Sequence, residues 1–198
     1  MKIGILGGSF NPIHFGHLIL AENVGKEAGL DKVILMPANT SPFKVGTKSA
    51  SNEDRFNMVK LAVSGNEYLE ASDFESASER ISYTIDTMKM LREIYPSDEL
   101  YFILGADSAL TLEKWKGAEE LITQFPIRIG GRPGYDDEKL EQYVEGLRDK
   151  YDADICVVEI PKADVSSTEI RKRSREGRSI KYLTPDAVAE YIVSGKIY

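Results

Sequence analysis

The sequence is poor in the residues that build disulfides and metal clusters. Its 198 residues include one cysteine and two histidines. A single cysteine excludes an internal disulfide framework. A metal site on the histidine pair would need a carboxylate to complete it, and we expect no metal held by the protein alone. The cysteine, Cys156, lies in the apolar run 155–158, so we expect a small buried hydrophobic side chain and not a reactive thiol.

Long hydrophobic runs are also missing. No apolar stretch approaches the roughly 20 residues that a membrane-spanning helix needs. The apolar run at the N-terminus stops at Gly7 and Gly8, and such a run is too short for a signal peptide. We therefore expect a cytoplasmic protein without a membrane partner.

An excess of positive charge is missing as well. The formal net charge is −7, which argues against general nucleic-acid binding. The stretch 162–181 differs, because it has seven basic and three acidic residues, a local balance of +4. These residues suit either a solvated helix face or a site where one or two of them hold a small anion. The basic residues are Lys162, Arg171, Lys172, Arg173, Arg175, Arg178 and Lys181.

Short β-rich apolar runs alternate with amphipathic stretches along the whole chain. This pattern is typical of an α/β fold, and it predicts a single Rossmann-like, doubly wound parallel sheet with helices on both faces. We expect one domain over residues 1–198. The predicted strands are 2–6, 32–37, 69–72, 99–104, 127–130 and 154–160. The predicted helices are 17–28, 52–64, 83–94, 118–124, 137–151, 167–175 and 185–194.

Polar residues and a proline mark where several of these helices should begin. Ser51 and Ser82 precede two of them as candidate N-caps, and Pro185 occupies a first helical position. Two long loops are expected, at 39–51 and 130–136. The first follows a strand end, which is where ligands bind in open α/β sheets.

The segment 7–17, with the letters G-G-S-F-N-P-I-H-F-G-H, follows the first predicted strand. Two glycines let the backbone approach a ligand closely, and the helix that follows offers unpaired N–H groups to an anion. His14 and His17 are three residues apart, so both rings can point to one side. No Walker-type phosphate loop and no G-x-G-x-x-G fingerprint is present, which argues against a kinase, an ATPase or a dinucleotide dehydrogenase.

This segment resembles the G-G-x-F-x-P-x-H-x-G-H signature of the bacterial nicotinate mononucleotide adenylyltransferases, within the H-x-G-H nucleotidyltransferase superfamily. Further similarities span nearly the whole chain in the same order. They are the stretches 35–37 and 41–44, S-Y-T at 82–84, G-A-D-S at 105–108 with Trp115, S-S-T-E-I-R at 166–171, and Pro185 with Tyr191. One departure is Phe43, where many family members have a histidine.

The resemblance implies that AMP passes from ATP to nicotinate mononucleotide, with pyrophosphate leaving and no covalent enzyme intermediate. It implies four catalytic residues: His14, His17, Lys44 and Arg171. It places ATP against Gly7, Gly8, Ser9, Phe10, His14, His17, Gly105, Asp107, Ser166, Ser167, Thr168 and Arg171. It places the mononucleotide against Lys44, Tyr83, Thr84, Asp107 and Trp115. A Mg²⁺ ion held mainly by the ATP phosphates is expected.

Alternatives remain open for several of these assignments. Trp115 suits the core as well as a stacking site, Ser167 suits a helix cap, and Arg171 has basic neighbours that position alone does not separate from it. For the whole chain, the alternatives are a phosphopantetheine adenylyltransferase and a nucleotide-binding sensor without catalysis. A cytidylyltransferase is less favoured because its R-T-x-G-I-S-T ending is absent. A homo-oligomer is compatible with the sequence.

Overall fold

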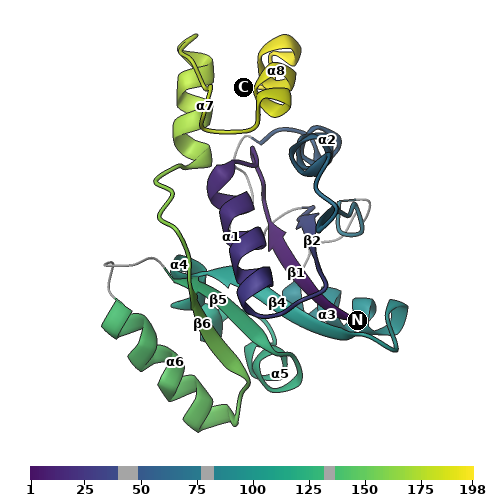
Figure 1. Cartoon of the computed structure of the whole chain (residues 1–198), viewed down its shortest axis with the longest axis vertical. Coiled ribbons are helices and arrows are strands. Elements are labelled where there is room, and N and C mark those ends of the chain that lie inside the picture. The colour runs from purple at the N-terminus through teal and green to yellow at the C-terminus, as the bar shows by residue number, and fades with distance from the viewer. Residues whose placement is uncertain (40–48, 77–82, 132–136) are drawn as a thin grey trace.

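The computed structural model describes residues 1–39, 49–76, 83–131 and 137–198. Six strands form one sheet in the order β3-β2-β1-β4-β5-β6, and every neighbouring pair is parallel (Figure 1). The predicted doubly wound parallel sheet is therefore confirmed, and each strand lies within two residues of its prediction. The strands are β1 (Lys2–Gly8), β2 (Lys32–Pro37), β3 (Leu69–Ala71), β4 (Glu99–Gly105), β5 (Ile127–Gly131) and β6 (Ile155–Glu159).

All the predicted helices are present within two residues of their predicted bounds. The short helix α4 and the 3₁₀ turn η1 were not predicted, because so few residues cannot display a helical period. The helices are α1 (Phe15–Glu27), α2 (Asn52–Val63), α3 (Thr84–Ile94), α4 (Ala106–Ala109), η1 (Leu112–Lys114), α5 (Ala118–Gln124), α6 (Asp137–Tyr151), α7 (Ser167–Arg175) and α8 (Asp186–Gly195).

The start signals of these helices had different outcomes. Ser51 caps α2 as predicted, because its hydroxyl accepts a hydrogen bond from the Asp54 N–H at 3.0 Å. Pro185 is the N-cap residue of α8 and not its first helical residue. The predicted cap Ser82 lies outside the described residues.

Two hydrophobic clusters fill the two faces of the sheet. One packs α1 and α2 against one face and extends to residues of α8, and the other packs α3, α5 and α6 against the opposite face. Successive side chains of a strand point to opposite faces, so in β1 Leu6 joins the first cluster while Ile3 and Ile5 join the second. Helices α7 and α8 lie beyond one end of the sheet, next to the start of α1 (Figure 1).

The expected burial of Cys156 is wrong, because its side chain is exposed. Its strand, β6, is the last in the sheet order and, among the described residues, pairs only with β5. The neighbouring Ile155 and Val158 are buried in the clusters on opposite faces of the sheet, so this edge strand is covered only in part and Cys156 occupies an uncovered position. No helix in the described ranges is both long and apolar enough to cross a membrane.

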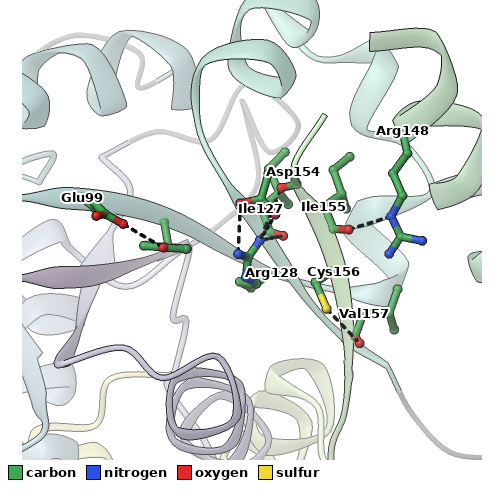
Figure 2. A network of polar contacts seen from close by, with 9 residues as sticks. Glu99, Ile127, Arg128, Arg148, Asp154, Ile155, Cys156 and Val157 are labelled. Carbon is green, nitrogen blue, oxygen red and sulfur yellow. Dashed lines mark hydrogen bonds and ion pairs between the residues drawn. The ribbon is translucent and has the colours of Figure 1, made fainter. Parts of the chain in front are cut away.

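A group of polar contacts joins β5 and β6 at their amino ends (Figure 2). We use "amino-end clasp" for Arg128 and Asp154, whose guanidinium and carboxylate make two hydrogen bonds of 2.8 and 3.1 Å. Arg128 also donates to the Ile127 carbonyl at 3.0 Å. Nearby, Arg148 Nε donates to the Ile155 carbonyl at 2.7 Å. Here arginines hold backbone carbonyls, and a carboxylate neutralises Arg128.

Candidate functional site

A cavity of about 830 Å³ lies at the opposite, carboxyl end of the sheet, where β1 and β4 finish. This volume is typical of small-molecule sites in proteins. Most of the residues predicted for ATP and the mononucleotide line it, although they come from segments far apart in the sequence. They are Gly7, Gly8, Ser9, Phe10, His14, His17, Tyr83, Thr84, Gly105, Asp107, Trp115, Ser166 and Ser167.

The turn after β1 brings the chain from the sheet into α1. Phe10 has a φ of 41°, in the left-handed region that side chains rarely adopt. Its ring packs over Gly8, where an added Cβ would lie 3.1 Å from the ring. An added Cβ on Gly7 would meet nothing within 4 Å. Gly8 therefore admits the Phe10 ring, whereas Gly7 leaves open space on the cavity wall.

His14 and His17 lie against each other at the start of α1. Their ring centroids are 3.7 Å apart with 24° between the planes, and the Phe10 ring meets His17 edge-on at 5.0 Å. The His14 N–H donates to His17 Nδ1 at 3.3 Å. In the neutral form of His17, Nε2 therefore carries the proton and is a donor. The stacking and the cap contact fix both rings in place without a ligand.

Four side chains from other elements hold the segment 9–13 from outside through its carbonyl groups. All four hydrogen bonds are short, and their donors lie in α2, in α7 and just before α8. The pairs are Arg55 with Ser9 O at 2.8 Å, Arg171 with Asn11 O at 2.7 Å, Ser167 with Pro12 O at 2.8 Å, and Thr184 with Ile13 O at 2.8 Å. These bonds restrict the backbone that carries the two histidines.

The Asn11 side chain adds a further link to this segment. Its Oδ1 accepts from the Ala50 N–H at 3.1 Å and from the Tyr198 hydroxyl at 2.8 Å. Burial raises the pKa of Tyr198, so the phenol stays protonated and continues to donate at neutral pH. Residues 187 positions apart in sequence thus meet beside the histidines.

The α7 residues divide into two groups. Ser166 and Ser167 line the cavity, whereas Thr168 and Arg171 do not. Ser166 and not Ser167 is the N-cap, because its hydroxyl accepts from the Glu169 N–H at 3.2 Å. The Arg171 guanidinium donates to Asn11 O and, at 3.2 Å, to Thr168 Oγ1. Arg171 therefore lies behind the β1–α1 turn, and the Ser167 hydroxyl is bonded to Pro12 O.

An aromatic region forms another part of the cavity. Trp115 is half-buried, meets the Phe102 ring edge-on at 6.0 Å and donates from Nε1 to Thr111 Oγ1 at 3.3 Å. Tyr83 is the N-cap residue of α3. Lys116 Nζ lies 4.0 Å from the centroid of the Tyr83 ring. Trp115 thus packs on the core and also presents surface to the cavity.

The remaining predicted assignments concern the end of β4, the loop after β2 and a bound metal. Gly105 ends β4 and is the N-cap residue of α4, and the exposed Asp107 lies in its first turn. Lys44 and Phe43 lie outside the described residues. Within the described ranges, no group of three or more His, Cys, Asp or Glu side chains could hold a metal ion.

Sequence reasoning missed several polar residues at this site. Arg55 and Thr184 hold the β1–α1 turn, and Glu75, whose carboxylate accepts from Thr87 Oγ1 at 2.6 Å, lines the cavity. Arg55 had a signal, because helical spacing places it on the apolar face of α2 with Met58. The other two lie in irregular segments, where the sequence shows no periodicity to interpret.

Comparisons with known proteins identify relatives along the chain. The family model of cytidylyltransferase-like proteins matches residues 5–173. A probable nicotinate-nucleotide adenylyltransferase from Lachnoclostridium phytofermentans is 40% identical over all of this chain and 98% of its own length. One from Carboxydothermus hydrogenoformans is 42% identical over the same shares of both chains.

A solved structure shows the same fold. The nicotinic acid mononucleotide adenylyltransferase of Plasmodium falciparum, complexed with NaAD, superimposes with a TM-score of 0.79 at 23% identity, over 100% of this chain and 97% of that one. The sequence relatives, matched along the full chain, identify the family more narrowly than the fold does. The chain therefore belongs to the nicotinate-nucleotide adenylyltransferase family, within the cytidylyltransferase-like proteins.

Proposed function

We propose that this protein transfers AMP from ATP to nicotinate mononucleotide, giving nicotinate adenine dinucleotide and pyrophosphate in NAD biosynthesis. One observation carries the proposal: a single cavity joins the histidine pair and the start of α7 to the aromatic region around Trp115. The full-length relatives with this name support it. We place the reaction in the cytoplasm, in one domain over residues 1–198.

The reaction needs no nucleophile from the protein. A phosphate oxygen of the mononucleotide attacks the α-phosphorus of ATP, and the bond from that phosphorus to the bridging oxygen breaks as pyrophosphate leaves. Such a transfer depends on alignment and on stabilisation of the charge that develops. His14 and His17 would supply this stabilisation, because they are already fixed in place on the cavity wall and His17 Nε2 is a donor.

The start of α7 would bind the leaving pyrophosphate. Free N–H groups in the first helical turn favour an anion, and Ser166 and Ser167 face the cavity there. Arg171 would add positive charge close to the same phosphates. Lys44 would approach from the loop after β2. Mg²⁺ would enter with ATP, because this ion prefers phosphate oxygens and water as ligands.

The aromatic region would bind the mononucleotide. The pyridine ring would stack on Trp115, and the N–H groups at the start of α3, around Tyr83 and Thr84, would bind the nicotinate carboxylate. A carboxylate only accepts hydrogen bonds, whereas the amide of the nicotinamide form would turn its own donors toward these N–H groups. Asp107 would accept from a ribose hydroxyl. This arrangement favours the acid over the amide.

A product assay with alternative acceptors tests the proposal. Purified protein is mixed with ATP, Mg²⁺ and either nicotinate mononucleotide, nicotinamide mononucleotide or phosphopantetheine, and pyrophosphate and product are measured. We expect kcat/KM for the acid to exceed that for the amide by about tenfold or more, as one mismatched buried hydrogen bond costs about 1.4 kcal/mol.

Other results of this assay would contradict the proposal. Turnover with phosphopantetheine alone would show that the aromatic region recognises a different acceptor. ATP binding without turnover on any acceptor would identify a sensor. Equal turnover of acid and amide would contradict the role given to the α3 N–H groups.

A further inference from the structure

Arg55 is a buried charge directly behind the wall of the cavity. Its residue is only 3% exposed. One guanidinium nitrogen donates to Ser9 O at 2.8 Å, and the other donates to Asn39 O at 2.8 Å and to Asn52 Oδ1 at 2.6 Å. Ser9 follows β1 and Asn39 follows β2, so Arg55 joins the two segments that leave neighbouring strands at the cavity end of the sheet.

Among the described residues, the acceptors of Arg55 are all neutral oxygens. In the ranges that the structure describes, no carboxylate lies within ion-pair distance of its guanidinium. Burial lowers the pKa of Arg55, but the ordinary pKa of arginine is so high that the side chain remains protonated at neutral pH. A buried charge without a counter-ion costs free energy unless an opposite charge offsets it.

Holding a carbonyl does not by itself require a charge. Ser167 and Thr184 hold the carbonyls of Pro12 and Ile13 in the same segment with neutral hydroxyls, each at 2.8 Å. Arg55 does the same for Ser9 with a positive group, and Ser9 lines the cavity. The charge therefore lies one residue behind the surface where a polyphosphate would bind, and the low dielectric there preserves its effect.

We propose that Arg55 is a positioning residue for adenylyl transfer. Its hydrogen bonds fix the Ser9–His14 backbone against Asn39. Its positive charge, which lies behind Ser9, attracts the ATP phosphates. The inference rests on the proposed function and extends it to a residue outside the cavity. The fork of the guanidinium supplies the geometry, because it reaches two carbonyls at once. Its charge supplies the attraction. The two contributions are separable by substitution.

Arg55→Lys and Arg55→Met separate them. Lysine keeps the charge but is a single point donor, so we expect kcat to fall about tenfold while the Kd for ATP changes less than about threefold. Methionine removes both contributions, so we expect kcat to fall by at least as much and the Kd for ATP to rise about tenfold. Calorimetry with ATP and Mg²⁺ gives the Kd without an acceptor, and the pyrophosphate assay gives kcat.

Arg148→Met is the matched control. Arg148 is half-buried and holds one carbonyl, that of Ile155 at 2.7 Å, away from the cavity (Figure 2). We expect this variant to lose thermal stability and to keep the wild-type kcat and Kd. All variants are assayed at a temperature where circular dichroism shows that they are folded.

Several outcomes would overturn the inference. One is that both folded Arg55 variants keep kcat and Kd within about twofold of the wild type. Another is that Arg148→Met shows the same losses, which would make the effect of Arg55 purely structural. If the wild type gives no turnover with nicotinate mononucleotide, the proposed function fails, whereas an unchanged Kd in Arg55→Met would separately refute the attraction of ATP.

Discussion

The two ends of the sheet both use arginine to hold backbone carbonyls, but they treat its charge differently. At the amino end, Arg128 holds the Ile127 carbonyl and is neutralised by Asp154 in the amino-end clasp. At the carboxyl end, Arg55 and Arg171 hold the carbonyls of the β1–α1 turn, and their acceptors in the described ranges are neutral oxygens. The arginine charge is neutralised by a carboxylate at the amino end, whereas at the carboxyl end it has no carboxylate partner in the described ranges.

This difference separates stability from function. In the amino-end clasp the Asp154 side chain is 59% exposed and the Arg128 side chain 14%. Because water reaches the carboxylate, the ion pair should contribute about 1 kcal/mol to stability, near the upper end for exposed pairs. At the carboxyl end, Arg55 is desolvated without a carboxylate partner in the described ranges, which is unfavourable unless an anion binds nearby. Substitutions at the two ends should therefore affect different measurements.

The largest effect is expected from His17→Ala. The ring lies at the cavity and is fixed by His14 and Phe10 before substrate binds, so its loss should reduce kcat about 100-fold or more. Loss of its contact with the His14 N–H removes part of a helix cap, which costs about 1 kcal/mol of unfolding free energy. Pyrophosphate release and chemical denaturation measure the two quantities. Near-normal turnover in the folded variant would refute the role of His17 in charge stabilisation.

Two glycines of β1 allow effects on ATP binding and effects on stability to be compared within one strand. An added Cβ on Gly7 would project into open space at the cavity, so Gly7→Ala should raise the Kd for ATP about tenfold and change the unfolding free energy by less than about 0.5 kcal/mol. An added Cβ on Gly4 would lie 2.6 Å from Ile103 Cδ1. Gly4→Ala should therefore cost about 1–3 kcal/mol of stability and leave the ATP affinity of the folded protein unchanged.

The two glycine variants together decide whether the space beside Gly7 takes part in ATP binding. If Gly7→Ala destabilised the protein as much as Gly4→Ala while binding ATP normally, the space beside Gly7 would have no part in binding. Calorimetry and denaturation on the same preparations decide the question.

The smallest effect is expected from Arg128→Met. It breaks the amino-end clasp but leaves the cavity intact, so the unfolding free energy should fall by about 1 kcal/mol. Added salt should narrow the difference from the wild type, because screening weakens the exposed pair. The kcat and the Kd for ATP should not change. A loss of turnover in this variant would mean that the two ends of the sheet are not independent.

The sequence predicted the sheet and its helices well because both depend on local patterns. Strands such as β4 are continuous apolar runs, and a helix such as α2 shows its cap at Ser51. The cavity residues of segment 7–17 were predictable for a related reason: they are consecutive, and a motif of consecutive residues can be recognised. The exposure of Cys156 was not predictable, because the order of strands, and hence which strand lies at the edge, is a tertiary property.

Contacts between segments that are distant in sequence were also not predictable. Nothing local indicates that Arg171 donates to Asn11 O or that Thr184 reaches Ile13 O, across 160 and 171 residues. The apolar face of α2 carried a signal that Arg55 is buried, which the sequence analysis missed, and its acceptors at Ser9 and Asn39 could be found only in the folded chain.

The carbonyl contacts of segment 9–13 also bear on the order in which the protein matures during synthesis. The histidine segment emerges early from the ribosome, whereas its supports at Ser167, Arg171 and Thr184 emerge more than 150 residues later. Contacts of such high sequence separation are slow to form, because a long loop must close first. A nascent chain can therefore form much of the sheet before the β1–α1 turn is held by these hydrogen bonds. ATP binding should then appear only in the last stage of translation.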